Sequence, residues 1–393
     1  MRMSTGATGA AVPGVPDAGA VNAGAVNAGA VKAGAGDIGA VDAVVLVGGQ
    51  GTRLRPLTLS APKPMLPTAG VPFLEHLLSR IREAGMRHVV LGTSYRAETF
   101  SDYFGDGSAF GLDIEYVVED EPLGTGGAIR NVYDRLTANH VMVFNGDILS
   151  GLDLGALYRT HRQQDAAVTL HLTRVDDPRA FGCVPTGPNG HVLAFLEKTE
   201  NPPTDQVNAG CSVFRREVIG KIPADRVVSV ERETFPGLIE SGAIVAGHVD
   251  TSYWLDLGTP AAFVRGSVDL VRGLAPTAAL PQPAGAHLRL PGATVDPAAE
   301  IGGGTALGRD VRVAAGASVQ GSVVFDGADI RAGARVVDSV IGQGAVIGAD
   351  AVVVGAVIGD GATVGAGCEL LSGIRVWPGV QLPAGGIRFS APS

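Results

Sequence analysis

A glycine-rich run followed by two basic residues is the segment best suited to chemistry. Residues 48–53 read GGQGTR, and Lys63 lies ten residues after Arg53. Glycines let backbone N–H groups approach a phosphate chain that bulkier residues would block. Arg53 offers a planar fork of donors and Lys63 a point charge. Because a tight turn after a strand also uses glycine, the run indicates a phosphate site only in combination with other residues.

Two aspartates could complete such a site. Asp147 follows the apolar run Val141–Phe144, and Asp256 lies in the segment YWLDLGTP. If the fold brings them together, the two carboxylates could hold Mg²⁺ on the phosphates of a nucleoside triphosphate. A single Asp more often serves as a helix cap or turn residue. A second glycine cluster, Gly124–Gly127, predicts a second loop that closes over a base and ribose, although a simple turn would use the same residues.

Alternating strands and helices must position these residues. Short apolar runs predict strands at 41–47, 88–91, 114–118, 141–144 and 168–172. Helical spacing falls between them, at 72–84, 96–104, 126–136 and 154–164. This order predicts an α/β, Rossmann-like, mainly parallel sheet that is covered on both faces. Ligands of such sheets bind beyond the carboxyl ends of the strands, where Gly48 and Asp147 both fall.

The C-terminal part follows a different period. Aliphatic residues recur every six positions from Val295 to Leu382, with five-residue steps at Val324, Ile341 and Ile358, and small residues lie between them. Three such steps make a turn of about 17–18 residues, which is typical of a hexapeptide parallel β-helix whose coils stack on one another. The sequence therefore predicts a β-helix domain after a Pro- and Ala-rich linker.

The motifs resemble those of the sugar-1-phosphate nucleotidylyltransferases. GGQGTRLRPLT followed by PKPMLP is similar to the signature of that family. PLGTGGAI, FNGDI, FLEKTE, NAGCSVF and WLDLGTP resemble its later motifs, in the same order. The resemblance covers nearly all of residues 41–393. It is closest to the branch that joins GTP and mannose 1-phosphate and carries a left-handed β-helix tail.

The resemblance implies roles for residues at matching positions. The nucleotide-binding residues would be Gly48, Gly49, Gly51, Thr52, Glu119 and Gly124. The catalytic residues would be Arg53, Lys63, Asp147 and Lys198. The sugar-binding residues would be Gly182, Glu197, Lys198 and Asn208. The ligands of Mg²⁺ would be Asp147 and Asp256.

These residue types suit an in-line transfer without a general base. The oxygen of a sugar 1-phosphate is already an anion, so it can attack the α-phosphorus while pyrophosphate leaves. The protein then has to align the reactants and offset their charge. Glu119 is the candidate for base selection, because one carboxylate can accept both N1–H and the 2-amino group of guanine. Pyrimidine-using relatives tend to have Gln there, and Glu119 could instead be a solvated charge in an acidic run.

Three alternatives differ in substrate or class. Glucose 1-phosphate with UTP, dTTP or ATP would keep the chemistry. A silent regulatory or scaffold subunit would not need Arg53, Lys63 and Asp147, which are all present. An acyltransferase, another activity of hexapeptide β-helices, usually needs a histidine within the coils, and residues 295–393 contain none.

Composition sets the remaining expectations. The chain has 393 residues, enough for two or three domains, and a formal net charge of −9 that disfavours nucleic acid and anionic membranes as partners. Three widely spaced cysteines fit a reduced, cytoplasmic protein. We predict a disordered low-complexity tail (1–40), a nucleotidyltransferase domain (41–275), a linker (276–290) and a β-helix (291–393). Stacked coils leave end and side surfaces that favour a homo-oligomer.

Overall fold

The computed structural model describes residues 38–94, 96–224, 226–280 and 285–388. Most of the predicted low-complexity tail therefore lies outside the described residues. Ile38–Ala40 form a short 3-10 helix (η1), and Ile38 is buried. No helix in the described part of the chain combines the length and the hydropathy that a bilayer span requires.

The sheet that carries the glycine-rich run has nine strands among the described residues and is mainly parallel. Its strand order is β10-β9-β11-β6-β1-β4-β5, and β8 and β12 extend it from β11. The strands are β1 (Val41–Leu46), β4 (His88–Thr93), β5 (Asp113–Val118), β6 (His140–Asn145), β8 (Val168–Arg174), β9 (Gly182–Cys183), β10 (Leu196–Glu197), β11 (Gln206–Arg215) and β12 (Val245–Val249). β11 runs antiparallel to both β6 and β8, whereas β1 is parallel to β4 and β6.

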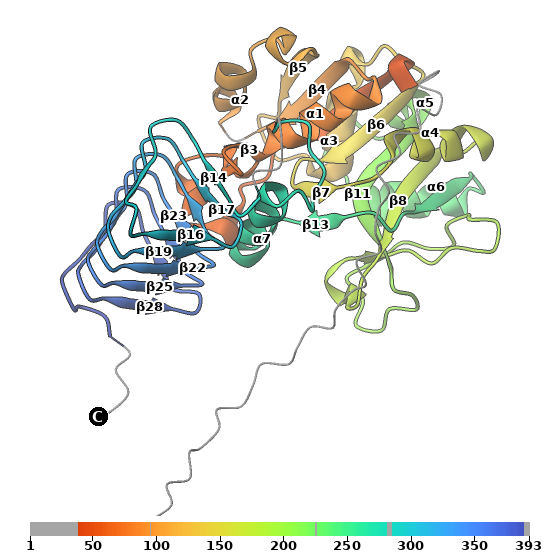
Figure 1. Cartoon of the computed structure of the whole chain (residues 1–393). Coiled ribbons are helices and arrows are strands. Elements are labelled where there is room, and N and C mark those ends of the chain that lie inside the picture. The colour runs from red at the N-terminus through yellow and green to blue at the C-terminus, as the bar shows by residue number, and fades with distance from the viewer. Residues whose placement is uncertain (1–37, 95, 225, 281–284, 389–393) are drawn as a thin grey trace, which may run out of the picture. The chain divides into compact units, whose positions relative to one another are not determined.

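Helices connect these strands (Figure 1). The α-helices are α1 (Phe73–Ala84), α2 (Ala97–Phe104), α3 (Gly124–Asn131), α4 (Leu154–Gln163), α5 (Arg216–Gly220), α6 (Phe235–Glu240) and α7 (Pro260–Val271). Shorter helices are η5 (Ser108–Phe110), η6 (Tyr133–Arg135), η7 (Pro178–Ala180) and the π-helix η8 (Val230–Thr234). Short strand pairs are β2 (Pro67–Thr68) with β3 (Val71–Pro72), and β7 (Ile148–Ser150) with β13 (Trp254–Asp256).

Apart from the buried Asp42, the central strand β1 is apolar, because both faces of the sheet are covered. Val45 belongs to one core cluster with Leu74, Leu78 and Ile81 of α1. Val44, its neighbour in sequence, belongs to a second cluster on the other face, with Ile129 of α3. The predicted order of strands and helices and the predicted mainly parallel sheet are both confirmed.

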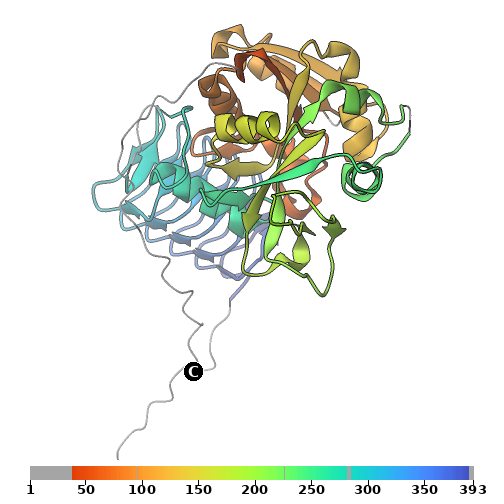
Figure 2. The ribbon, with the colours of Figure 1, turned by 90° about the vertical axis from the view of Figure 1, so that its right-hand side faces the viewer.

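The C-terminal part is a stack of parallel coils, as Figures 1 and 2 show. Three sheets run along the stack: β14-β17-β20-β23-β26-β29, β15-β18-β21-β24-β27-β30, and β16-β19-β22-β25-β28. The first sheet consists of His287–Arg289, Thr305–Leu307, Val323–Val324, Val340–Ile341, Val357–Ile358 and Arg375–Val376. The second consists of Thr294–Val295, Arg312–Val313, Asp329–Ile330, Val346–Ile347, Thr363–Val364 and Gln381–Leu382. The third consists of Glu300–Gly302, Ser318–Gln320, Arg335–Val337, Val352–Val354 and Glu369–Leu371.

The six-residue period predicted from the sequence corresponds to these strands. The periodic aliphatic residues from Val295 to Leu382 lie one to a strand, in β15 through β30. They form the interior of the stack together with small residues such as Ala328 and Ala345, which are fully buried. The architecture is consistent with a left-handed β-helix.

Candidate active site

The glycine-rich loop leaves the sheet at the carboxyl end of β1 and continues through three short 3-10 turns. These turns are η2 (Thr52–Leu54), η3 (Leu57–Leu59) and η4 (Lys63–Met65). Gly51 has φ +59°, a conformation that side chains disfavour. A Cβ there would also lie 2.9 Å from the Thr58 methyl and 3.0 Å from Lys63 Cβ. Gly51 therefore lets the loop fold back so that Lys63 lies beside it.

Gly48 is held from a neighbouring strand. The Ser94 hydroxyl, just after β4, donates to the Gly48 carbonyl oxygen at 2.5 Å. A Cβ at Gly48 would come within 2.9 Å of that hydroxyl oxygen. Sequence reasoning missed Ser94, because only its position at the carboxyl end of an adjacent parallel strand connects it to the loop.

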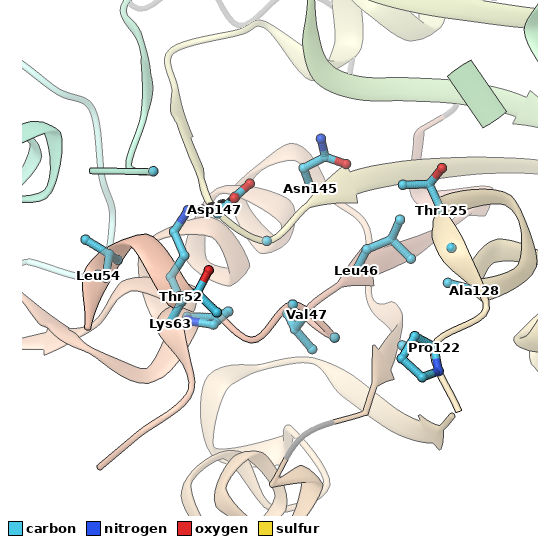
Figure 3. Close-up of a pocket in the computed structure, with 18 of the residues that line it drawn as sticks. Leu46, Val47, Thr52, Leu54, Lys63, Pro122, Thr125, Ala128, Asn145 and Asp147 are labelled. Atoms are coloured by element: carbon cyan, nitrogen blue, oxygen red, sulfur yellow. Dashed lines mark hydrogen bonds and ion pairs between the residues drawn. The ribbon is translucent and has the colours of Figure 1, made fainter. Parts of the chain in front are cut away.

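The pairing of β7 with β13 brings the two predicted aspartates together. Asp256 lies opposite Ile148, the residue after Asp147, and the Leu257 amide donates to the Asp147 carbonyl oxygen at 3.1 Å. Lys63 reaches both carboxylates: its Nζ is 2.7 Å from Asp147 Oδ2 and 3.9 Å from Asp256 Oδ1. Figure 3 shows the Lys63 amine pointing at Asp147. A cation and two anions thus meet beyond the ends of β1 and β6.

Asp256 is the less solvated of the two carboxylates. Burial, followed by the negative charge of Asp147, raises the pKa of Asp256, although Lys63 and Arg53 act in the opposite direction. Its Oδ1 is buried and accepts no hydrogen bond. A buried carboxylate oxygen without a hydrogen-bond partner beside a second carboxylate is a donor set suited to a hard divalent cation. In the part of the chain that the structure describes, no group of three or more His, Cys, Asp or Glu side chains could hold a metal by itself. Other ligands would therefore have to come from substrate phosphates or water.

The second glycine cluster is not the loop that the sequence predicts. Gly124–Gly127 form the first turn of α3, and the amides of Gly126 and Gly127 donate to the Val228 carbonyl oxygen at 2.8 and 3.3 Å. Cβ atoms at Gly124 and Gly126 would lie 2.7 Å from Val228 atoms. The glycines therefore allow the chain near Val228 to pack onto the start of the helix. That contact joins distant segments, so local sequence could not reveal it.

A hydrogen-bond network fixes this start of α3. Thr125 donates to Glu231 Oε2 at 2.7 Å, and the Val230 amide donates to the Thr125 hydroxyl at 3.0 Å. Ser229 donates to the same Glu231 oxygen. Thr125 lines the cavity described next, and sequence reasoning did not single it out.

A cavity of about 510 Å³ collects most of the predicted residues. The predicted residues that line it are Gly48, Gly49, Gly51, Thr52, Arg53, Lys63, Glu119, Gly124, Asp147 and Asp256. Figure 3 shows Lys63 and Asp147 on one side and Pro122, Thr125 and Ala128 on the other, with Leu46 and Val47 between them. The cavity therefore has a charged part and a more apolar part.

Glu119 lines this cavity directly after β5. Its Oε2 accepts a hydrogen bond from the Leu123 amide at 3.2 Å, which fixes the carboxylate. Burial raises the pKa of Glu119, and the hydrogen bond from Leu123 opposes that effect. The carboxylate is therefore partly removed from water and is not simply a solvated charge.

The four predicted sugar-binding residues do not line the cavity. Gly182 on β9 pairs with Glu197 on β10, and Asn208 lies on β11. Lys198 has φ +51°, and its Nζ lies 3.4 Å from Glu197 Oε1.

Trp254 connects these strands to the charged part of the cavity. Its indole N–H donates to the Ala209 carbonyl oxygen at 3.0 Å, and its ring lies 5.5 Å from the Phe181 ring. Phe181 precedes Gly182, Ala209 follows Asn208, and Asp256 lies two residues after Trp254. The predicted sugar-binding strands therefore lie close to Asp256, although they are outside the cavity itself.

Comparisons with known proteins agree with this geometry. Residues 42–272 match the nucleotidyl transferase family, and residues 284–383 match the GMPPB C-terminal domain. The chain is 64% identical over 352 residues to the mannose-1-phosphate guanylyltransferase of Mycobacterium tuberculosis, covering 89% of this chain and 98% of that relative. It is 32% identical over 286 residues to the probable mannose-1-phosphate guanylyltransferase 3 of Oryza sativa, covering 72% and 78% of the two chains.

A solved structure also resembles the N-terminal part. HddC from Yersinia pseudotuberculosis, solved in complex with GMP-PN, superimposes with a TM-score of 0.51 at 29% identity, covering 58% of this chain and 98% of that one. The matching family model spans more than half of this chain, and the relatives above match most of its length. The chain therefore belongs to the sugar-1-phosphate nucleotidylyltransferase family.

Proposed function

We propose that this protein transfers GMP from GTP to mannose 1-phosphate and releases pyrophosphate, so that GDP-mannose is the product. The observation that carries this proposal is the meeting of Lys63, Asp147 and Asp256 at the charged part of one cavity, beside the glycine-rich loop. The 64% identity to a mannose-1-phosphate guanylyltransferase supports the choice of substrates.

The reaction needs alignment and charge neutralisation. A phosphate oxygen of the sugar phosphate attacks the α-phosphorus of GTP, the bond from that phosphorus to the bridging oxygen breaks, and pyrophosphate leaves. Backbone N–H groups of the glycine loop hold the triphosphate, and Arg53 and Lys63 offset the charge of the departing pyrophosphate. Lys198 would hold the phosphate of the sugar substrate. The nucleophile is already an anion, so no side chain has to remove a proton.

A divalent cation, which we propose to be Mg²⁺, fits Asp147 and Asp256. When bound, it would supply positive charge to the triphosphate oxygens. Asp256 contributes a buried oxygen without a hydrogen-bond partner, and Asp147 contributes an oxygen that is more exposed to solvent. Lys63 already contacts both carboxylates, so it keeps them together and stands next to the reacting phosphates.

Base selection is assigned to Glu119. Its carboxylate lines the same cavity as the charged residues and is fixed by the Leu123 amide. A fixed carboxylate presents two acceptor positions to the two adjacent donors of guanine, whereas uracil and thymine present a donor beside acceptors. The sugar hydroxyls are assigned to Gly182, Glu197 and Asn208, whose strands are connected to Asp256 through Trp254.

Further proposals concern the cellular location, the oligomeric state and the domain boundaries. We propose a cytoplasmic location, which fits three cysteines that are all buried and free, and a homo-oligomer that uses the β-helix surface. The division into a catalytic domain (41–275), a linker (276–290) and a β-helix (291–393) remains a proposal. The strand β14 (His287–Arg289) already pairs with β17, so pairing within the stack begins before residue 291.

A substrate panel tests the proposal. Pyrophosphate release is measured for GTP, UTP, dTTP and ATP, each with mannose 1-phosphate and with glucose 1-phosphate. The GTP and mannose 1-phosphate pair is expected to give the highest kcat/KM. Faster turnover of another pair would change the proposed substrates but not the proposed reaction. If no pair released pyrophosphate, the protein would be a silent subunit and the proposal would be wrong.

A further inference from the structure

One face of the β-helix differs from the other two. In each strand of the stack, one residue points into the interior and the residue before it points outward. On two of the sheets this outward position is exposed or half-buried and mostly polar, as at Arg312, Asp329 and Arg335. On the first sheet it is occupied, in β20, β23 and β26, by three valines in register, Val323, Val340 and Val357, which we call the valine row. Side chains of the valine row are at most 3% exposed.

The glycine-rich loop and α7 cover the valine row. A single buried cluster contains the valine row, Phe325, Phe263 and Val264 of α7, and three leucines from the loop and its continuation, Leu54, Leu57 and Leu66. Arg375, which pairs in register with Val357, donates from its guanidinium to the Arg55 carbonyl oxygen at 2.8 Å. Apolar and polar contacts to the loop thus come from successive coils of the same sheet.

The loop contributes residues both to the substrate cavity and to the buried cluster. Arg53 lines the cavity, and its neighbour Leu54, which also borders the cavity, is fully buried and packs in the cluster. Lys63 reaches the two aspartates, and Leu66, whose amide donates to the Lys63 carbonyl oxygen at 3.1 Å, is buried in the same cluster. Short 3-10 turns have weak intrinsic stability. The position of such a loop therefore depends on what its apolar side packs against.

We propose that the valine row is a positioning surface for the phosphate-binding loop. Through Leu54, Leu57 and Leu66 it holds the backbone that aims Arg53 and Lys63 at the triphosphate. The β-helix thereby forms the back of the nucleotide site and contributes to turnover. This inference rests on the proposed nucleotidyl transfer for its kinetic consequence, whereas its structural consequence is independent of the substrate.

Two matched double variants test the inference. Val323→Ala/Val340→Ala shortens the valine row, and Val336→Ala/Val353→Ala removes the same atoms from the interior of the same stack. All four side chains are at most 2% exposed. For each variant, kcat and KM for GTP, thermal unfolding, and hydrogen exchange of residues 52–66 without substrate are measured.

We expect the valine-row variant to lose about tenfold in kcat/KM, because small displacements of aligned groups are costly, and to exchange faster over residues 52–66. The interior variant is expected to unfold at a lower temperature but to keep kcat/KM and the exchange of the loop. The inference is overturned if the valine-row variant keeps the kcat/KM and the loop exchange of the unmodified protein. It is also overturned if the interior variant changes both quantities as much as the valine-row variant does. Absence of turnover in the unmodified protein would refute the proposed function alone, because loop exchange still decides the inference.

Discussion

Acid should destabilise this protein through histidines that are buried in the neutral form. His76 is the clearest case: its side chain is fully buried, its Nδ1 contacts the Thr277 hydroxyl at 2.7 Å and its Nε2 contacts the Thr68 carbonyl oxygen at 2.8 Å. Burial lowers the pKa of His76 to about 4, against an ordinary value of 6.5. His161 and His171 are buried in the same way, and burial lowers their pKa values to about 3 and about 4.

The sign of this pH dependence follows from the difference in proton binding between the folded and the unfolded state. The unfolded chain takes up a proton at His76 as the pH falls through 6.5, whereas the folded protein resists protonation until about pH 4. Stability is therefore lost between these two values as the pH falls. Between pH 7.5 and pH 5 the difference for one such histidine amounts to about 2 kcal/mol.

The variant His76→Gln tests this value. Free energies of unfolding are measured by guanidinium denaturation at pH 7.5 and pH 5 for the variant and the unmodified protein. The variant is expected to be less stable at pH 7.5, because it loses a fitted side chain, but its stability should fall by about 2 kcal/mol less on acidification. An equally steep fall in both proteins would refute the assignment of His76 as a buried neutral histidine.

The remaining predictions concern the site. Asp147→Asn and Asp256→Asn should each lower kcat by about 10²-fold or more, since either loses a carboxylate that would hold the divalent cation at the phosphates; near-normal kcat with an intact circular dichroism spectrum would contradict the metal assignment. Glu119→Gln should reduce the ratio of GTP to UTP kcat/KM by about tenfold, and an unchanged ratio would reject a role in reading guanine. Gly124→Ala should cost about 1–2 kcal/mol of stability and raise KM for GTP, because φ is +70° and the new Cβ would lie 2.7 Å from the Val228 carbonyl oxygen. A variant with unchanged melting temperature would show that the helix start can shift freely.

The β-helix could be predicted almost residue by residue. Each coil repeats a local rule, in which an aliphatic residue points inward and small residues allow close turns, so the period in the sequence is the period in space. The valine row was visible in the same repeat, since Val323, Val340 and Val357 recur at 17-residue intervals. The sequence does not show which segment packs on this row, because Leu54 and Leu66 lie more than 250 residues earlier in the chain.

The cavity illustrates the same limit. Placing Gly48 and Asp147 at the carboxyl ends of strands was sufficient to predict one shared edge, because β1 and β6 are parallel neighbours. The pairing of β7 with β13, which brings Asp256 to Asp147, depends on two short strands without a strong local pattern. The packing of Val228 on the start of α3 likewise depends on a distant segment, so the start of this helix at Gly124 could not be predicted from local sequence.

The regular stack has a constant repeat distance along its axis. Successive coils add about 4.8 Å along its axis, and the valine row uses only the coils that carry β20, β23 and β26. Coils added or removed beyond Arg375 would move the far end of the stack in fixed increments while the loop stayed where it is. The length of the β-helix could thus change by whole coils without any change to the active-site loop.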